Sequence, residues 1–486
     1  MSREWPAYIY AKQIEPWEYW QLRRIVMKTT YRYLFYVTCL VYGLGGHAAE
    51  FTLPKYEKII LDNGLTVYLL EQKEVPLVDI LMVVKTGAIN DTHSGLAQIT
   101  AENLLLGTSK LDRTSFEQKL DFVGATVRTS AGLESTSVSA SLASQDIDLV
   151  LPLLRDALLF PAFNQAEFDS QKERYLAALI RQKESPKARI NGYFNALLYQ
   201  GHSYANNVDG NETSVKEMSL KRIMAFHHSW YTPTNSAIVV SGDIDSQYMA
   251  GKLKHLFGDW QGSLKVSETA PLPVPVKSKV FLVNKSDATE STFMIGGPGV
   301  KRSNPDFVAI KVINTILGAR FTSWLNDELR VNSGLTYGAR SRFDAKIAGG
   351  SFYISTFTKT ATTTEAMDLA LKTYSRLWET GIDKKTLESA KAYVKGQFPP
   401  NYETSSDLAN LLGNMYVYGF DEQFINTFSE QVNQLDVDKS KQIINDYFPK
   451  EHLQFVVVGK ADDIRDQLKK YGQLVEANIK DDILVL

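Results

Sequence analysis

Apolar and polar residues alternate along the chain with two periods, one typical of strands and one of helices. Two strand-like runs flank an Asn-Gly pair within 58–71, and that pair is typical of a tight hairpin turn. Residues 80–84 are uniformly apolar, as in a buried strand, and 127–142 alternates Thr or Ser with Val or Ala, as a half-exposed strand does. Helical spacing prevails over 145–160 and 165–184. The pattern predicts a fold of class α+β.

A weak internal repeat runs through this pattern. The apolar run 238–243 follows a Tyr-Thr-Pro turn, and a similar run at 456–460 follows Tyr-Phe-Pro. A helix-like segment that ends near a glycine also occurs twice, at 95–107 and at 306–318. Because both pairs are separated by about 210 residues, we predict two homologous halves.

The join between the halves is expected at 262–279, where three prolines alternate with apolar residues as in an extended linker. The first domain is then 50–261 and the second is 280–486. Each half is expected to form an antiparallel-rich sheet with helices on one side.

Residues 1–49 are interpreted as an N-terminal extension and a secretory signal peptide. Lys28 and Arg32 precede a mostly apolar stretch at 33–46, and Ala48 and Ala49 supply small residues for cleavage. The stretch is too short to span a bilayer comfortably, so no stable membrane span is expected in the mature chain. The alternative to a signal peptide is a buried N-terminal helix. Met27 is interpreted as the translation start.

Composition and charge exclude several functions. The chain has 53 Lys and Arg against 55 Asp and Glu, and no basic stripe, so nucleic acid is not an expected partner. Its single cysteine excludes a disulfide scaffold and a Cys-based zinc finger. This Cys39 lies in the predicted signal, and a cysteine-free mature chain fits an oxidising compartment. We expect an exported protein, in the periplasm of a Gram-negative bacterium.

The segment 95–108 reads GLAQITAENLLLGT. It resembles the zinc-binding helix of the insulinase/pitrilysin family of zinc peptidases, in which H-x-x-E-H stands between Gly-Leu-Ala and Gly-Thr. In that family the two histidines hold Zn²⁺, and the glutamate acts as general base on the bound water. The flanks match in this chain, and the ligands do not.

All four metal and base positions of the family differ here. Gln98 and Glu102 stand at the two histidine positions, and Ala101 stands at the base. The third ligand, a glutamate on a later helix, aligns with Leu179. A single carboxylate cannot make a zinc site, so the resemblance implies that this chain holds no metal. A zinc site relocated to His93 is not supported, because the spacing between His93 and Glu102 does not place them on the same helix face.

The segment 325–338 reads LNDELRVNSGLTYG and resembles the family's C-terminal signature. In that signature an arginine and a tyrosine face the zinc across the substrate cavity, and Arg330 and Tyr337 match these positions. The resemblance implies that both are catalytic: a guanidinium and a phenol are donors able to meet a developing oxyanion. The alternatives are a solvated charge for Arg330 and a half-buried strand aromatic for Tyr337.

The strand 129–136 corresponds to the edge strand on which the family lays its substrate by β-addition. The substrate-binding residues carried over by the resemblance are Ala131, Gly132, Leu133 and Glu134. An unpaired edge has to be either used or covered.

Some members of this family work as heterodimers of a zinc-bearing subunit and a metal-free subunit, which together close a clamshell. The resemblance implies that this chain is such a non-zinc subunit: inactive alone, with the zinc in its partner and a peptide as substrate. The alternative is a non-catalytic scaffold with the same fold, either structural or a homodimeric peptide binder.

We predict that the mature protein begins near Glu50 and lies outside the cytoplasm. N-terminal sequencing of the native protein should therefore find none of residues 30–45. A soluble native protein that retains this stretch would contradict the signal-peptide interpretation.

Overall fold

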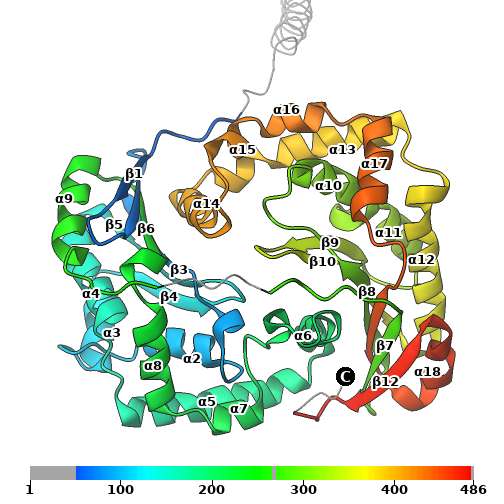
Figure 1. Cartoon of the computed structure of the whole chain (residues 1–486), viewed down its shortest axis with the longest axis horizontal. Coiled ribbons are helices and arrows are strands. Elements are labelled where there is room, and N and C mark those ends of the chain that lie inside the picture. Colours follow the sequence, from blue (N-terminus) through cyan, green and yellow to red (C-terminus); the bar gives the residue numbers. More distant parts are fainter. Residues whose placement is uncertain (1–50, 265–269, 483–486) are drawn as a thin grey trace, which may run out of the picture. The chain divides into compact units, whose positions relative to one another are not determined.

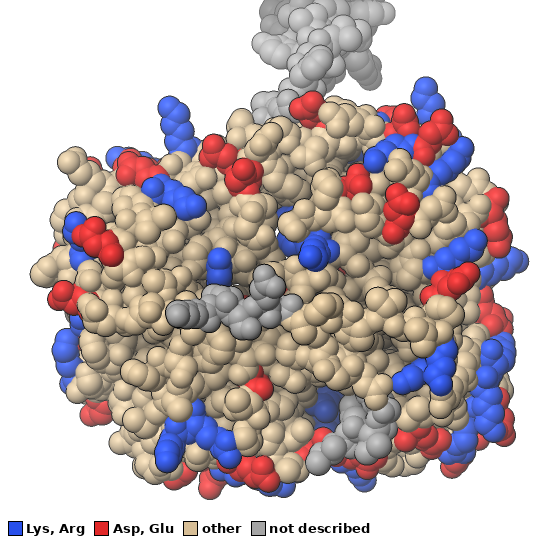
Figure 2. All heavy atoms as spheres, viewed as in Figure 1, with Lys and Arg blue, Asp and Glu red and all other residues tan. Residues whose placement is uncertain are grey.

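The computed structural model describes residues 51–264 and 270–482 of the 486-residue chain. The predicted signal peptide at 1–49 lies outside the described residues. Thr52–Leu486 forms one compact unit. In the described ranges no helix is long and apolar enough to cross a bilayer. Acidic and basic side chains are interspersed on the face seen in Figure 2.

The first half of the chain forms a six-stranded mixed sheet (Figure 1). Its strand order is β1-β2-β6-β3-β5-β4, and β2 and β6 are its only parallel neighbours. The strands are β1 (Glu57–Ile60), β2 (Thr66–Glu71), β3 (Leu77–Val84), β4 (Thr126–Ala131), β5 (Thr136–Ala143) and β6 (Ser236–Gly242).

The second half forms a sheet of the same size, ordered β12-β7-β11-β8-β10-β9. Strand β7 runs parallel to both of its neighbours, and the other pairs are antiparallel. The strands are β7 (Lys279–Asn284), β8 (Glu290–Pro298), β9 (Arg340–Ala345), β10 (Gly350–Lys359), β11 (Gln454–Gly459) and β12 (Gln473–Asn478).

Helices connect the strands in both halves. The first half contains α2 (Leu96–Asn103), α3 (Arg113–Phe122), α4 (Ile147–Leu159), α5 (Gln165–Lys183), α6 (Pro186–Leu198), α7 (Glu212–Lys216), α8 (Leu220–Trp230) and α9 (Ser246–Phe257). The second contains α10 (Phe307–Asn314), α11 (Trp324–Asn326), α12 (Thr363–Glu379), α13 (Lys384–Gln397), α14 (Ser405–Tyr418), α15 (Glu422–Asn426), α16 (Phe428–Asn433), α17 (Val437–Tyr447) and α18 (Ala461–Leu468).

The two sheets confirm the predicted two-halved α+β fold. Strands β6 and β11, which carry the repeated apolar run, both take the third place in their sheets. Helices α2 and α10 likewise correspond to the repeated helix-like segment. The Asn-Gly pair lies in the turn between β1 and β2, where Gly64 has a φ of +89°.

The segment 127–142, expected as one strand, is a hairpin of β4 and β5. The chain reverses at 132–135, where the Gly132 N–H donates to the Ser135 carbonyl at 2.7 Å. Ala131 therefore lies opposite Thr136. Both strands expose one face, so the alternation of polar and apolar residues continues from β4 into β5. Periodicity alone therefore did not reveal that the chain reverses direction between them.

The structure adds an exchange of helices between the halves, which the sequence did not predict. Helix α14, from the second half, packs on β3 and β6 of the first sheet. Helix α6, from the first half, packs on β8 and β11 of the second sheet. Side chains of α6 form one apolar cluster with the second sheet: Ile190, Tyr193, Phe194 and Leu197 with Phe281, Val283, Met294, Val456 and Val458.

Strand β3 shows why the exchange is needed. Val78, Ile80 and Met82 point into the core built by the first half's own helices. The intervening Leu81 and Val83 are also buried, and they face Gly413 of α14. Because successive strand residues point to opposite faces, both faces of this sheet are apolar and both need cover.

We predict that Gly413→Val destabilises the protein. A Cβ at Gly413 would lie 2.7 Å from Leu81 Cδ2 and 3.2 Å from Val83 Cγ2, so a branched side chain would push α14 off the sheet. Such overpacking costs about 1–3 kcal/mol of unfolding free energy, measurable by denaturant titration.

The matched control is Gly396→Val in α13, where a Cβ would meet nothing within 4 Å. This substitution should change the free energy of unfolding by less than about 0.5 kcal/mol. Equal effects of the two variants would show that α14 does not approach the sheet closely at Gly413.

Candidate functional site

Helix α2, which carries the degenerate motif, is fixed at its N-terminus by a half-buried carboxylate. Asp91 accepts the Gly95 N–H on Oδ2 at 2.9 Å and the Ala97 N–H on Oδ1 at 2.8 Å. Gly95 makes this turn with a φ of +89°, a conformation that favours glycine. Burial raises the pKa of Asp91 to about 7. The start of the helix is therefore held by the chain itself.

A chain of polar side chains occupies the two aligned histidine positions. Gln98 Nε2 donates to Glu102 Oε1 at 2.9 Å, and Gln171 Nε2 of α5 donates to Glu102 Oε2 at 2.5 Å. Both oxygens of the one carboxylate are thus bound by amides. Ala101, at the base position, is fully buried and has no group that transfers a proton. This arrangement cannot activate a water molecule for hydrolysis.

On α5, Leu179 packs in the hydrophobic core with 4% of its surface exposed. The residue that reaches Glu102 is Gln171, which the sequence did not predict. Residues three or four apart share a helix face, so the row through Gln171 continues to the exposed Ala178 rather than to Leu179. A carboxylate at 178 would therefore point the same way as Gln171.

No group of three or more His, Cys, Asp or Glu side chains in the described part of the chain is placed to hold a metal ion. His93 lies beside a cation, since Arg222 Nη1 is 3.1 Å from His93 Nδ1. A guanidinium at this distance disfavours a second cation on the ring, so the structure gives no support to a relocated site.

Gln98 also reaches the outer edge of the first sheet. Its Oε1 accepts the Ala131 N–H at 2.8 Å, at the end of edge strand β4. In an antiparallel strand, alternate residues direct their backbone N–H and C=O groups to the same side. The backbone N–H and C=O groups of Val127 and Thr129 therefore also point away from β5. The Gln98 amide thus occupies one end of the edge on which the family resemblance places substrate.

The residues after Ala131 form contacts within the chain. The carbonyls of Gly132 and Leu133 accept the N–H groups of Ala88 and Ile89, each at 3.0 Å. The outward-facing backbone of β4 therefore lies upstream of these two residues, within Thr126–Ala131.

Glu134 joins the two halves. It is 5% exposed, and its Oε1 accepts both the Tyr204 hydroxyl and the Ile347 N–H, the latter at 2.9 Å. The Tyr204 oxygen in turn accepts the Ala348 N–H at 3.0 Å. Burial raises the pKa of the Glu134 carboxyl. The loop between β9 and β10 is thereby fastened to the first half.

Arg330 and Tyr337 lie in the second half, beside β9. Arg330 belongs to a short π-helical stretch, η6 (Asp327–Asn332), a wide turn often found at functional sites. Its guanidinium carbon lies 4.6 Å from the centroid of the Phe321 ring. Tyr337 is 82% exposed, and its ring stacks on Phe357 with centroids 6.4 Å apart.

Both residues line one cavity of about 760 Å³. All residues that line it lie within 307–393, so no residue of α2 contributes. The structure therefore brings Arg330 and Tyr337 to the same cavity, but not to the degenerate metal positions of this chain.

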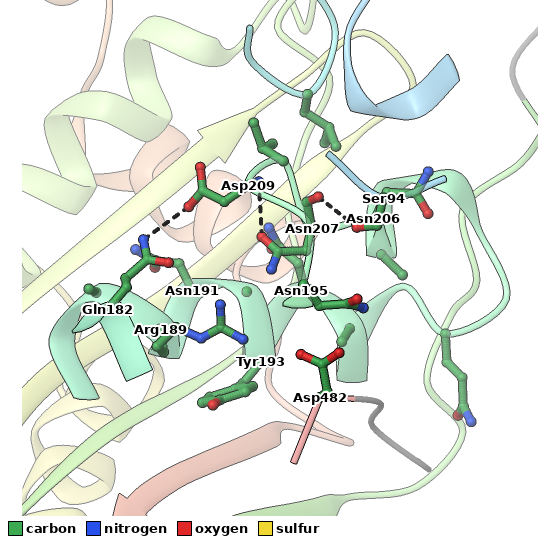
Figure 3. Close-up of a pocket in the computed structure, with 18 of the residues that line it drawn as sticks. Ser94, Gln182, Arg189, Asn191, Tyr193, Asn195, Asn206, Asn207, Asp209 and Asp482 are labelled. Atoms are coloured by element: carbon green, nitrogen blue, oxygen red, sulfur yellow. Dashed lines mark hydrogen bonds between the residues drawn. The ribbon is translucent and has the colours of Figure 1, made fainter. Parts of the chain in front are cut away.

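A second cavity, of about 810 Å³, lies between α5, α6 and the segment 200–211 (Figure 3). Gln182 donates to Asp209 Oδ2 at 3.0 Å on its wall, and Ser94 donates to the Asn207 carbonyl at 2.8 Å. Leu133 also lines it. Its polar lining comes from α5, from separate turns of α6, from the segment 200–211 that follows α6, and from three residues distant in sequence, so no motif marked it; the three are Ser94, Lys346 and Asp482.

Comparison with known proteins gives two family matches. Residues 66–212 match the family described as insulinase (peptidase family M16), and 217–394 match the peptidase M16 inactive domain.

Two curated relatives come from Helicobacter pylori. One is named non-peptidase homolog YmxG; it is 23% identical over 376 residues, covering 76% of this chain and 86% of that protein. The other is named zinc protease PqqE; it is 24% identical over 434 residues, covering 85% of this chain and 94% of that protein.

Two solved structures share the fold. A peptidase M16 inactive domain from Pseudomonas fluorescens has a TM-score of 0.79 at 23% identity, covering 83% of this chain and 98% of that chain. A protease from Helicobacter pylori has a TM-score of 0.76 at 22% identity, covering 84% of this chain and 100% of that chain.

We predict that the purified chain binds no stoichiometric zinc and cleaves no peptide. Glu102 is the only carboxylate at the aligned positions, and two amides occupy it. Metal analysis after dialysis against zinc should therefore find far less than one ion per chain. About one zinc per chain, lost on Glu102→Ala or His93→Ala, would contradict this.

Rebuilding the site tests which residue of α5 faces Glu102. Gln98→His and Glu102→His combined with Ala178→Glu should create zinc binding detectable by calorimetry, before any activity. The same pair combined with Leu179→Glu should bind no zinc and unfold more easily, because it buries a charge. The reverse result would show that the face assigned to α5 is wrong.

Proposed function

Because the chain belongs to the insulinase family, peptidase family M16, we propose that it is the non-zinc subunit of a two-chain metallopeptidase. In this proposal the partner subunit supplies zinc, water and general base. This chain supplies Arg330 and Tyr337, which bind the substrate and stabilise the transition state. The complex degrades or processes peptides.

One observation carries the proposal. The catalytic positions on α2 are replaced, while Arg330 and Tyr337 remain together in a cavity open to solvent. Hydrolysis needs an activated water, which Ala101 and the amide-bound Glu102 cannot supply. A catalytic role for the surviving pair therefore requires zinc and water from another chain.

Each member of the pair has a distinct role in this scheme. Arg330 can grip a substrate carbonyl in the ground state and the oxyanion that forms from it. Tyr337 offers one hydroxyl donor, and the stacking of its ring on Phe357 limits the directions in which that donor points. Both act by binding and electrostatics, so neither needs metal on this chain.

A zinc-bearing member of the same family is the partner that fits. The relative named zinc protease PqqE matches this chain over 94% of its own length, which supports a partner of similar size and fold. The signal-like segment at 28–46 supports an exported complex, in a bacterial periplasm.

The second candidate function is a non-catalytic scaffold, structural or peptide-binding. The hydrogen bond from the Ala131 N–H to Gln98 favours it, because this bond occupies part of the edge strand on which the family resemblance places substrate. The relative named non-peptidase homolog YmxG also supports it. A scaffold would assemble normally and be insensitive to conservative changes at Tyr337.

We predict that Tyr337→Phe lowers the kcat of a complex reconstituted with its zinc-bearing partner. The variant removes one hydroxyl and little volume, so a true oxyanion donor should cost about 10²-fold in kcat with little change in KM. Arg330→Ala should lower kcat and raise KM together. Steady-state kinetics on one peptide substrate measures both.

The matched controls are Tyr248→Phe on α9 and Arg181→Ala on α5, both exposed and outside the cavity. These should keep normal turnover, and all four variants should co-elute with the partner on size exclusion. Unchanged turnover in Tyr337→Phe and Arg330→Ala would leave the scaffold function. Loss of co-elution would place the two residues in the subunit contact instead.

A further inference from the structure

The cavity that holds Arg330 and Tyr337 is strongly cationic. Its lining includes five basic residues and no Asp or Glu; the five are Lys311, Arg320, Arg330, Arg340 and Arg342. For a chain with 53 basic and 55 acidic residues, this concentration of one sign in one cavity is unlike the overall balance. A cavity lined by one sign of charge attracts ligands of the other sign.

These charges are not neutralised within the described part of the chain, where none of the five forms an ion pair. Two acidic residues close to them in the sequence are already used: Glu328 pairs with Arg376 at 3.2 Å, and Asp344 pairs with Lys346 at 2.7 Å. Arg320 donates from Nη1 to the Ser389 hydroxyl oxygen at 3.1 Å, a neutral partner that leaves the guanidinium charge unbalanced. The cavity therefore has unused capacity for carboxylates.

Two of the arginines are spaced for an extended ligand. Arg340 and Arg342 are exposed on β9, at the edge of the second sheet (Figure 1). Side chains two apart on a strand lie on the same face, about 6.6–7 Å apart. Alternate side chains of an extended peptide have the same spacing, so acidic residues at every second position can meet both arginines.

The rest of the lining suits a peptide better than a simple ion. Phe321 and Tyr337 present exposed rings beside Arg330, and Phe357 lies behind Tyr337. From the first half, Lys187 of α6 approaches the same group, with its Nζ 3.4 Å from the Phe357 centroid. Rings of this kind pack against peptide backbone and apolar side chains, while the cations select charge.

We propose that this cavity binds extended peptides that carry acidic side chains, and so makes the chain selective for acidic peptides. The proposal rests on the function proposed above, because Arg330 and Tyr337 line the same cavity. Arg320, Arg340 and Arg342 then determine specificity, by charge attraction that strengthens binding of carboxylates over their neutral counterparts.

The test is isothermal titration calorimetry of the full mature chain with three eight-residue peptides. Each alternates Ala with Asp, Asn or Lys, and each is acetylated and amidated. The Asp peptide should bind about tenfold more tightly than the Asn peptide, and the Lys peptide should not bind. The difference should shrink between about 50 and about 500 mM salt. Equal affinities for the Asp and Asn peptides would overturn the proposal.

Two further ligands separate other sources of negative charge. The Asn peptide with a free C-terminal carboxylate should bind with the same affinity as its C-terminal amide. An affinity equal to that of the Asp peptide would show that the cavity recognises the C-terminal carboxylate of a peptide and would overturn the proposal. An eight-nucleotide oligothymidylate should bind more weakly than the Asp peptide. The opposite order would assign the cavity to nucleic acid and overturn the proposal.

The deciding variant is Arg340→Gln combined with Arg342→Gln, which are exposed and so should leave the fold intact. This double variant should weaken the binding of the Asp peptide about tenfold and that of the Asn peptide less than about twofold. The matched control is Lys119→Gln with Arg181→Gln, on α3 and α5, which removes the same charge outside the cavity. An equal loss in both double variants would reflect net charge alone and contradict the proposal.

The two proposals fail separately. Charge-selective binding together with normal turnover in Tyr337→Phe and Arg330→Ala supports the acidic ligand and overturns only the catalytic partnership. Impaired turnover in those variants, with equal binding of the Asp and Asn peptides, supports the partnership and overturns the acidic ligand.

Discussion

Each six-stranded sheet of this protein has two apolar faces, and the helices of its own half cover one of them. Strand β3 shows the constraint in successive residues, since Met82 points to the local core and Leu81 and Val83 point to a helix from the other half. Helices α14 and α6 meet this need reciprocally. The halves are thus parts of one folding unit. The contact of Glu134 with the loop between β9 and β10 follows from that arrangement.

Hydrogen bonds within the chain hold the helix that carries the degenerate motif. Glu102 is held by Gln98 and Gln171, and the start of α2 is held by Asp91, so hydrogen bonds maintain the helix where ion coordination would otherwise contribute. The cavity around Arg330 is built from the second half alone. Substitutions at the aligned metal positions on α2 therefore leave the cavity around Arg330 intact, so the two sites can change independently in sequence.

Much of the fold follows from local patterns in the sequence. The repeat, the Asn-Gly turn and the helices at 147–159 and 165–183 depend on short-range periodicity and turn chemistry. The exchange of α6 and α14 does not, because an amphipathic pattern shows that a helix has an apolar face and not which sheet receives it. Gln171 was missed for a related reason: its role depends on how α5 packs against α2. The cationic cavity escaped notice because Lys311 and Arg342 are distant in sequence.

The exchange of helices also sets an order of events during synthesis. The first sheet is complete in sequence at Gly242, yet α14, which covers Leu81 and Val83, ends only at Tyr418. At ribosomal rates of about 5–20 residues per second, the uncovered face waits on the order of ten seconds or more for its helix. A nascent chain that had already formed this sheet would expose an apolar surface, and such surfaces make folding intermediates prone to aggregate. The first half therefore cannot bury all of its apolar surface until most of the second half is available to it.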